Sequence, residues 1–128
     1  MTDDTREKGI VNIPARNISA VIFDMDGLMY DTESLLREEW KNVAARHGID
    51  IPDSLIALTM GYTCSEVRTL FQKHFDRMGV RADATALHRE RNALMLERIE
   101  REGAPVKPGL YELLDHLREK GLRAAVAS

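Results

Sequence analysis

The sequence predicts an α/β fold in which a bundle of about four helices interrupts a parallel β unit. Three observations support this fold class: a short apolar run rich in β-branched residues at 20–23, helical periodicity from 32 to 103, and a second apolar run at 122–127 that follows one more helix. A strand that is apolar on both faces is typical of a buried parallel sheet. The expected order is therefore strand, four helices, linker, helix and strand.

The first half of the chain contains a leader, a strand and two of the expected helices. Residues 1–17 are polar and charged, and we expect a flexible leader there, followed by a core strand and loop at 18–31. A helix should start at Thr32 and end before Gly48, because Gly is the residue that most often stops a helix. Its apolar face would consist of Leu36, Trp40, Val43 and Ala44. A short helix opened by Pro52 should follow.

Two longer helices complete the bundle, which we expect to form a helical domain over 32–103. Thr63 and Glu66 have the spacing of a capping box, and the helix they start should stop at Gly79. Its apolar stripe is Val67, Leu70, Phe71, Phe75 and Met78. Asp83 can cap the last helix, which runs to Glu102, and the charged run from His88 to Arg101 in it is expected to be a solvated face.

Residues 104–128 are expected to return to the α/β unit. Two prolines and a glycine make 104–109 a linker, and leucines at helical spacing then predict a helix that Gly121 ends. The second strand is expected at 122–127. Because two strands do not make an independently stable parallel sheet, we expect the chain to be the first part of a longer polypeptide.

Composition disfavours several classes of function. The chain has 18 basic and 21 acidic residues, and the basic residues are scattered through the expected helices, so a nucleic-acid surface is not predicted. No apolar run approaches the roughly 20 residues that span a bilayer, so no membrane partner is expected. Cys64 is the only cysteine, which excludes an internal disulfide and favours a reducing, cytoplasmic setting. The oligomeric state does not follow from the sequence.

Two aspartates follow the first expected strand, at the end where open α/β sheets bind their ligands. Alternation along the extended backbone would put Asp24 and Asp26 on one side and Met25 on the other, and Gly27 lets the chain turn after them. Two carboxylates this close repel each other unless a cation lies between them or one is protonated. The pair therefore indicates either a Mg²⁺ site or an acid/base pair, and a simple solvated turn is the alternative.

These residues resemble a known motif. Residues 23–27, FDMDG, and 30–33, YDTE, resemble the first motif of the haloacid dehalogenase (HAD) superfamily, in the subgroup with a helical cap inserted after that motif. This subgroup includes β-phosphoglucomutase-like proteins and sugar-phosphate phosphatases. KPGL at 107–110 and AVAS at 125–128 are similar to the region around the second motif. The resemblance implies an incomplete Rossmann-like core of two strands and a helix, with a four-helix C1-type cap inserted at 32–103.

The resemblance also implies roles for individual residues. Asp24 would be the nucleophile that forms an aspartyl-phosphate, and Asp26 would protonate the leaving alcohol and then activate water. Asp24 and Asp26 would also bind Mg²⁺. Ser128 and the backbone N–H groups near Met25 and Gly27 would bind the substrate phosphate. The implied activity is the Mg²⁺-dependent hydrolysis of a small phosphorylated metabolite, a phosphate monoester of the sugar-phosphate kind.

One departure from the family pattern limits the catalytic expectation. Members of the family use a lysine from a third motif and acidic metal ligands from a fourth, and both would lie after Ser128. Lys107 precedes the helix and cannot take the part of that lysine. We therefore expect the full-length protein to be the active phosphatase and the 128-residue chain alone to be a poor catalyst.

Two alternative functions stay open. Mutase relatives carry an arginine just after a glycine-containing cap loop, whereas in the corresponding loop at 61–66 no residue is basic and Arg68 is the first basic residue to follow. This favours a phosphatase over a β-phosphoglucomutase-type mutase. The other alternative is a non-catalytic helical interaction module with a vestigial acidic loop. Hinges for a mobile cap are expected near 31–32 and 105–108.

Overall fold

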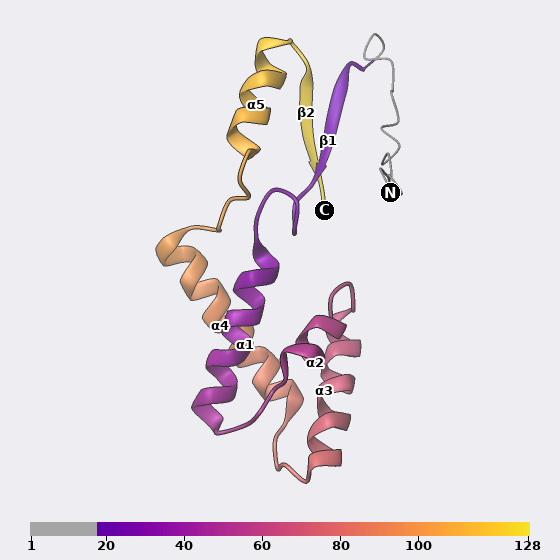
Figure 1. The fold of residues 1–128 in the computed structure, drawn as a ribbon, viewed down its shortest axis with the longest axis vertical. Coiled ribbons are helices and arrows are strands. Elements are labelled where there is room, and N and C mark those ends of the chain that lie inside the picture. Colours follow the sequence, from indigo (N-terminus) through magenta and orange to yellow (C-terminus); the bar gives the residue numbers. More distant parts are fainter. Residues whose placement is uncertain (1–17) are drawn as a thin grey trace, which may run out of the picture.

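A computed structural model describes residues 18–128. The leader expected at 1–17 lies outside the described residues. The chain forms a helical part, α1 to α4, and an α/β part, which consists of β1, α5 and β2 (Figure 1). The elements are β1 (Ala20–Asp24), α1 (Thr32–His47), α2 (Asp53–Leu58), α3 (Cys64–Met78), α4 (Ala84–Glu102), α5 (Leu110–Glu119) and β2 (Arg123–Ala127). The element order is the predicted one.

The α/β part contains a parallel pair of strands, as the sequence predicts. β1 and β2 pair in register from Ala20 opposite Arg123 to Asp24 opposite Ala127. The expectation of a buried strand at 20–23 holds for one face only. Phe23 packs against α5, but Ile22 on the opposite face is 70% exposed and every residue of β2 is exposed. The reason is that α5 covers one face of the pair and no described element covers the other.

The helical part has a closed apolar core. Trp40 stacks on Phe71 with ring centroids 4.4 Å apart, and Phe71 meets Phe75 edge to face at 6.1 Å. All three side chains are fully buried, which confirms them as core residues. Met78, at the end of the same stripe, was expected to share this core and does not: it is 63% exposed, because it is the last residue of α3 and no helix within residues 18–128 covers it.

The helix ends carry the capping groups that the sequence predicts. The Thr63 hydroxyl accepts from the Glu66 N–H while the Glu66 carboxylate accepts from the Thr63 N–H, so the capping box is present. Asp83 accepts from the backbone N–H groups at the start of α4. Gly48 ends α1 in the left-handed conformation, with φ at 63°. These local signals explain why the helix boundaries could be read from the sequence.

Two chain segments connect the parts and lie side by side. The Asp31 N–H donates to the Pro105 carbonyl at 2.8 Å, and the Lys107 N–H donates to the Met29 carbonyl at 2.9 Å. The Lys107 ammonium also lies 3.4 Å from an Asp31 carboxylate oxygen. The helical part is therefore inserted between two neighbouring segments, which are the positions expected for hinges.

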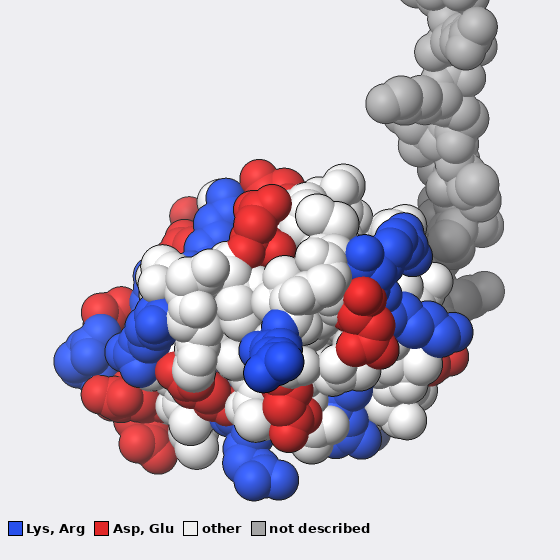
Figure 2. Space-filling model, turned by 90° about the horizontal axis from the view of Figure 1, so that it is seen from below, with Lys and Arg blue, Asp and Glu red and all other residues white. Residues whose placement is uncertain are grey.

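Charged side chains of both signs are mixed over the end of the molecule that the helical part forms. Figure 2 shows Lys and Arg alternating with Asp and Glu over this face, without a broad area of one sign. Among the helices of residues 18–128, none combines the length and the apolar character that crossing a membrane requires.

Candidate active site

Asp24 and Asp26 lie where β1 ends and the chain turns towards α1. Both side chains are exposed. One Asp24 carboxylate oxygen accepts from the Met25 N–H at 3.0 Å, and one Asp26 oxygen accepts from the Thr32 hydroxyl at 3.3 Å. Thr32 is the first residue of α1, so the start of this helix helps to orient Asp26.

The loop after β1 requires a glycine. Gly27 has a φ of 77°, and a Cβ built on it would lie 3.1 Å from a Glu33 carboxylate oxygen. The Gly27 N–H donates to the Tyr30 carbonyl at 2.9 Å, while the Met25 N–H donates to Asp24. Both N–H groups thus already have acceptors, and a role in phosphate binding would require them to exchange these acceptors for phosphate oxygens.

The strand register brings Ser128 to the same edge of the sheet. Ala127 is the parallel partner of Asp24, so Ser128 follows immediately beyond the end of the paired region. Its side chain is exposed. Asp24, Asp26 and Ser128 thus lie at one end of the two-stranded pair. Lys107 is engaged with Asp31 at the connection between the two parts.

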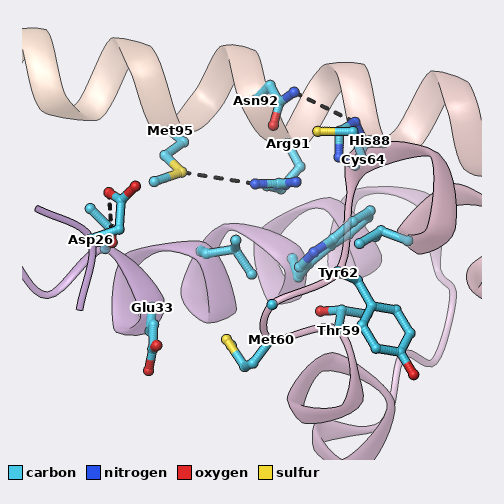
Figure 3. A pocket seen from close by; sticks show the side chains of 15 residues that line it. Asp26, Glu33, Thr59, Met60, Tyr62, Cys64, His88, Arg91, Asn92 and Met95 are labelled. Carbon is cyan, nitrogen blue, oxygen red and sulfur yellow. Dashed lines mark hydrogen bonds between the residues drawn. The ribbon is translucent and has the colours of Figure 1, made fainter. Parts of the chain in front are cut away.

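A pocket of about 320 Å³ opens between this loop and the helical part. Asp26 lines it from the loop and Glu33 from the first turn of α1, as Figure 3 shows, whereas Asp24 is not among its lining residues. The other walls come from α1, the loop before α3, and α4. Their lining residues are Thr32, Leu36, Trp40, Thr59, Met60, Gly61, Tyr62, Cys64, Val67, His88, Arg91, Asn92 and Met95.

Two residues of α4 contradict the expected solvated face. His88 is 4% exposed and Arg91 is 6% exposed. The Arg91 guanidinium lies over the Trp40 ring, 5.1 Å from its centroid, and its Nη1 is 3.9 Å from the Met95 sulfur. The signal that could have found them is their spacing: with the buried Ala84 and Leu87 they form an i, i+3, i+4, i+7 stripe that the charged residue types obscured.

Burial sets the charge states of these two side chains. Burial lowers the pKa of His88, and the nearby charges of Arg91 and Arg68 lower it further, so the imidazole is neutral near pH 7. Burial also lowers the pKa of Arg91, but a guanidinium stays protonated in proteins. The pocket therefore has the Asp26 carboxylate on the loop, the Glu33 carboxylate at the start of α1 and a buried cation on α4.

The family follows from a comparison with known proteins. The model of a haloacid dehalogenase-like hydrolase family matches residues 18–128. The chain belongs to the haloacid dehalogenase-like hydrolases. This confirms the resemblance that the motifs at 23–33 and 125–128 carry.

Two curated relatives of this hydrolase are named as phosphatases. One is (DL)-glycerol-3-phosphatase 1, mitochondrial, of Arabidopsis thaliana, 32% identical over 88% of this chain and 37% of the relative. The other is hexitol phosphatase A of Escherichia coli K12, 28% identical over 84% of this chain and 46% of the relative. The chain thus spans less than half the length of these relatives.

A solved structure shows the same fold. The β-phosphoglucomutase of Clostridium difficile has a TM-score of 0.60 with this chain at 22% sequence identity. The match covers 87% of this chain and 51% of that protein. It confirms the predicted class, a Rossmann-like two-stranded unit with an inserted helical part.

The loop after β1 offers oxygen atoms as ligands, and these are the ligands that Mg²⁺ prefers. Asp24 and Asp26 supply two carboxylates and the loop supplies backbone carbonyls, and Mg²⁺ commonly takes one or two carboxylates and keeps several waters. Within residues 18–128, no group of three or more His, Cys, Asp or Glu side chains could hold a metal. The residues present therefore fit part of a Mg²⁺ site.

Proposed function

We propose that the full-length protein hydrolyses small phosphate monoesters of the sugar-phosphate kind through an aspartyl-phosphate on Asp24. The observation that carries the proposal is the placement of Asp24 and Asp26 on one exposed loop at the carboxyl end of β1, where Asp26 faces a pocket beneath the helical part. The names of the two curated relatives, a glycerol-3-phosphatase and a hexitol phosphatase, support this substrate class.

The chemistry needs a nucleophile and a proton carrier. An Asp24 carboxylate oxygen bonds to phosphorus while the ester P–O bond breaks, and Asp26 gives its proton to the departing alcohol oxygen. Asp26 then takes a proton from water as the water oxygen bonds to phosphorus. The bond between Asp24 and phosphorus breaks, and inorganic phosphate leaves. Thr32, which donates to Asp26, holds that carboxylate towards the pocket.

The cofactor in this proposal is Mg²⁺. When bound, it supplies positive charge that offsets the repulsion between the anionic carboxylate and the anionic phosphate. Asp24 would hold it through the carboxylate and Asp26 through the backbone carbonyl. Ser128 would donate its hydroxyl to a phosphate oxygen, with the Met25 and Gly27 N–H groups as further donors once they are released from their present acceptors.

The helical part acts as a cap in this proposal. It closes the pocket over the loop, and the paired segments around Asp31 and Lys107 are the hinges on which it moves. Hydrolysis is favoured over phosphate transfer between two positions of a sugar, because the loop at 61–66 carries no arginine. We also propose the cytoplasm as the location of the protein, from its single cysteine.

The test is an assay of the full-length protein on a panel of sugar and polyol phosphates, with Mg²⁺ and with a chelator. Asp24→Asn should lower kcat by at least about 1,000-fold, because an amide is not a nucleophile towards phosphorus. Asp50→Asn, which changes another exposed aspartate outside the pocket, is the matched control and should leave kcat unchanged. Absence of hydrolysis across the panel would contradict the proposal and favour the interaction module.

A further inference from the structure

The pocket contains a buried cation that has no acidic partner. Arg91 forms no ion pair with any carboxylate of residues 18–128, and its Nε has no hydrogen-bond acceptor. On the same helix Arg98 behaves in the opposite way, since it pairs with Glu38, Glu39 and Glu102. Arg91 is therefore a distinct case on α4, because it is more deeply buried and yet lacks a counterion.

The present contacts of Arg91 offset only part of the cost of burying it. Removing a charged group from water is expensive unless it is paired and hydrogen-bonded. The Trp40 face provides a cation–π contact, and the Met95 sulfur is a weak acceptor. Neither gives the guanidinium the two parallel acceptor oxygens that its planar fork matches best. An anionic ligand in the pocket would provide them.

A second unused donor lies beside Arg91. His88 Nε2 is buried and has no partner, while the Asn92 amide nitrogen lies 3.5 Å from His88 Nδ1. If Asn92 donates to Nδ1, the imidazole proton is on Nε2, which makes this atom a further donor. In Figure 3, His88 and Arg91 come from the same helix, and Asp26 lies beyond Met95 at the other end of the drawn pocket.

We infer that the pocket binds a second anionic group of the substrate, a carboxylate or a phosphate, through Arg91 with His88 beside it. This inference rests on the proposed function, because it assigns the reacting phosphate to the loop with Asp24 and Asp26. The end of the substrate that does not react is then held by the helical part. Arg91 is the specificity-determining residue, because a substrate with a neutral end has no anionic group for Arg91 to bind.

A comparison of substrates on the unmodified full-length protein tests the inference without any variant. The panel pairs glycerol 3-phosphate with 3-phosphoglycerate, and glucose 6-phosphate with 6-phosphogluconate and with glucose 1,6-bisphosphate. We expect kcat/KM to be about 10- to 100-fold higher for at least one ester with a second anion than for its neutral counterpart, the range that a charged hydrogen bond supports. Whether 6-phosphogluconate or glucose 1,6-bisphosphate has the higher kcat/KM shows whether the pocket prefers a carboxylate or a phosphate. A protein that prefers the neutral members of both series would overturn the inference.

Variants of Arg91 separate recognition from chemistry. Arg91→Met keeps an apolar contact with Trp40 and should lower kcat/KM about 10- to 100-fold for the preferred ester with a second anionic group, mainly through KM. Esters with a neutral end should change less than about threefold, and Arg91→Lys should restore part of the loss. Arg89→Met, which removes an exposed charge two residues away, is the matched control. An equal loss for all esters would contradict the inference, because Arg91 would then act on the reacting phosphate or on the fold.

A binding measurement distinguishes failure of the inference from failure of the proposed function. Trp40 lies against Arg91 and is the only tryptophan of the 128 residues, so a fluorescence change that disappears in Trp40→Phe reports on an anion bound there. If no ester is hydrolysed, the proposed function fails. The inference still stands if glucose 1,6-bisphosphate or 6-phosphogluconate binds and Arg91→Met weakens binding about 10-fold or more. It fails if neither binds, or if both bind equally well to the variant.

Discussion

The helical part and the α/β part of this chain are packed in different ways. Eleven buried residues form one apolar cluster in the helical part, whereas four form the cluster of the α/β part. Trp40 is fully buried in the first, while Ile22 and Val126 in the second are 70% and 53% exposed. The proposed reactive carboxylates, Asp24 and Asp26, lie on the open part, and the buried cation Arg91 lies in the closed one. Catalysis and stability should therefore respond to different substitutions.

The largest expected effect is on catalysis and comes from the open part. Asp26→Asn should lower kcat about 100- to 10,000-fold for an alkyl phosphate, because the leaving alcohol then receives no proton. The loss of kcat/KM, which reports only the step in which the alcohol departs, should be much smaller for p-nitrophenyl phosphate, whose leaving group is stable without a proton. Unfolding free energy should change by less than about 0.5 kcal/mol, since the side chain is exposed. Equal losses of kcat/KM for both esters would contradict the role of Asp26 as the proton donor.

The next effect is on stability and comes from the closed part. Phe71→Ala should lower the free energy of unfolding of the helical part by about 3–5 kcal/mol, because it leaves a cavity between Trp40 and Phe75. Urea unfolding followed by Trp40 fluorescence measures this. Met78→Ala on the same helix is the control and should stay within about 0.5 kcal/mol, because Met78 is 63% exposed. Similar losses for the two variants would show that the core is placed wrongly.

A smaller effect should appear as a pH dependence of stability. Burial holds the pKa of His88 below its ordinary value of 6.5, so the unfolded chain binds more protons at this residue than the folded chain. The free energy of unfolding therefore has its full value with respect to His88 above pH 6.5. It falls as the pH is lowered from 6.5 towards the pKa of His88 in the folded chain, by at most about 1.4 kcal/mol per pH unit.

Unfolding measured between about pH 5 and about pH 7.5 checks this sign. His88→Gln should flatten the slope, whereas His116→Gln, which changes an exposed histidine on α5, should leave it unchanged. The pKa of Glu90 is lowered chiefly by its hydrogen bond with His47, so His47→Gln is a second control that separates this pair from His88. A slope that survives in His88→Gln would show that another group causes it.

Local signals in the sequence were enough to predict the helix boundaries and the acidic loop. The capping box at Thr63 and Glu66, the stop at Gly48 and the turn at Gly27 each depend on neighbouring residues alone. Such features can be read directly because their partners lie within a few positions. The family motif at 23–27 belongs to the same group, since it is one short segment.

Burial was harder to predict because it depends on distant partners. The residue type of Arg91 predicts that it is exposed to solvent. Its burial is explained by its contact with the Trp40 ring, which comes from α1. Ile22 reads as a core residue, yet the face of β1 that carries it has no cover among residues 18–128. The same limit explains why the pocket between the two parts could not be foreseen.

The measurement that tests the central claim most directly is the mapping of the phosphorylated residue. The full-length protein is mixed with a substrate from the panel, quenched during turnover and treated with borohydride, which reduces an aspartyl-phosphate to homoserine. Peptide mass spectrometry should then find homoserine at position 24 and unmodified aspartate at position 26. An enzyme that turns over the substrate while position 24 stays unmodified, or that is modified at position 26 instead, would contradict the account.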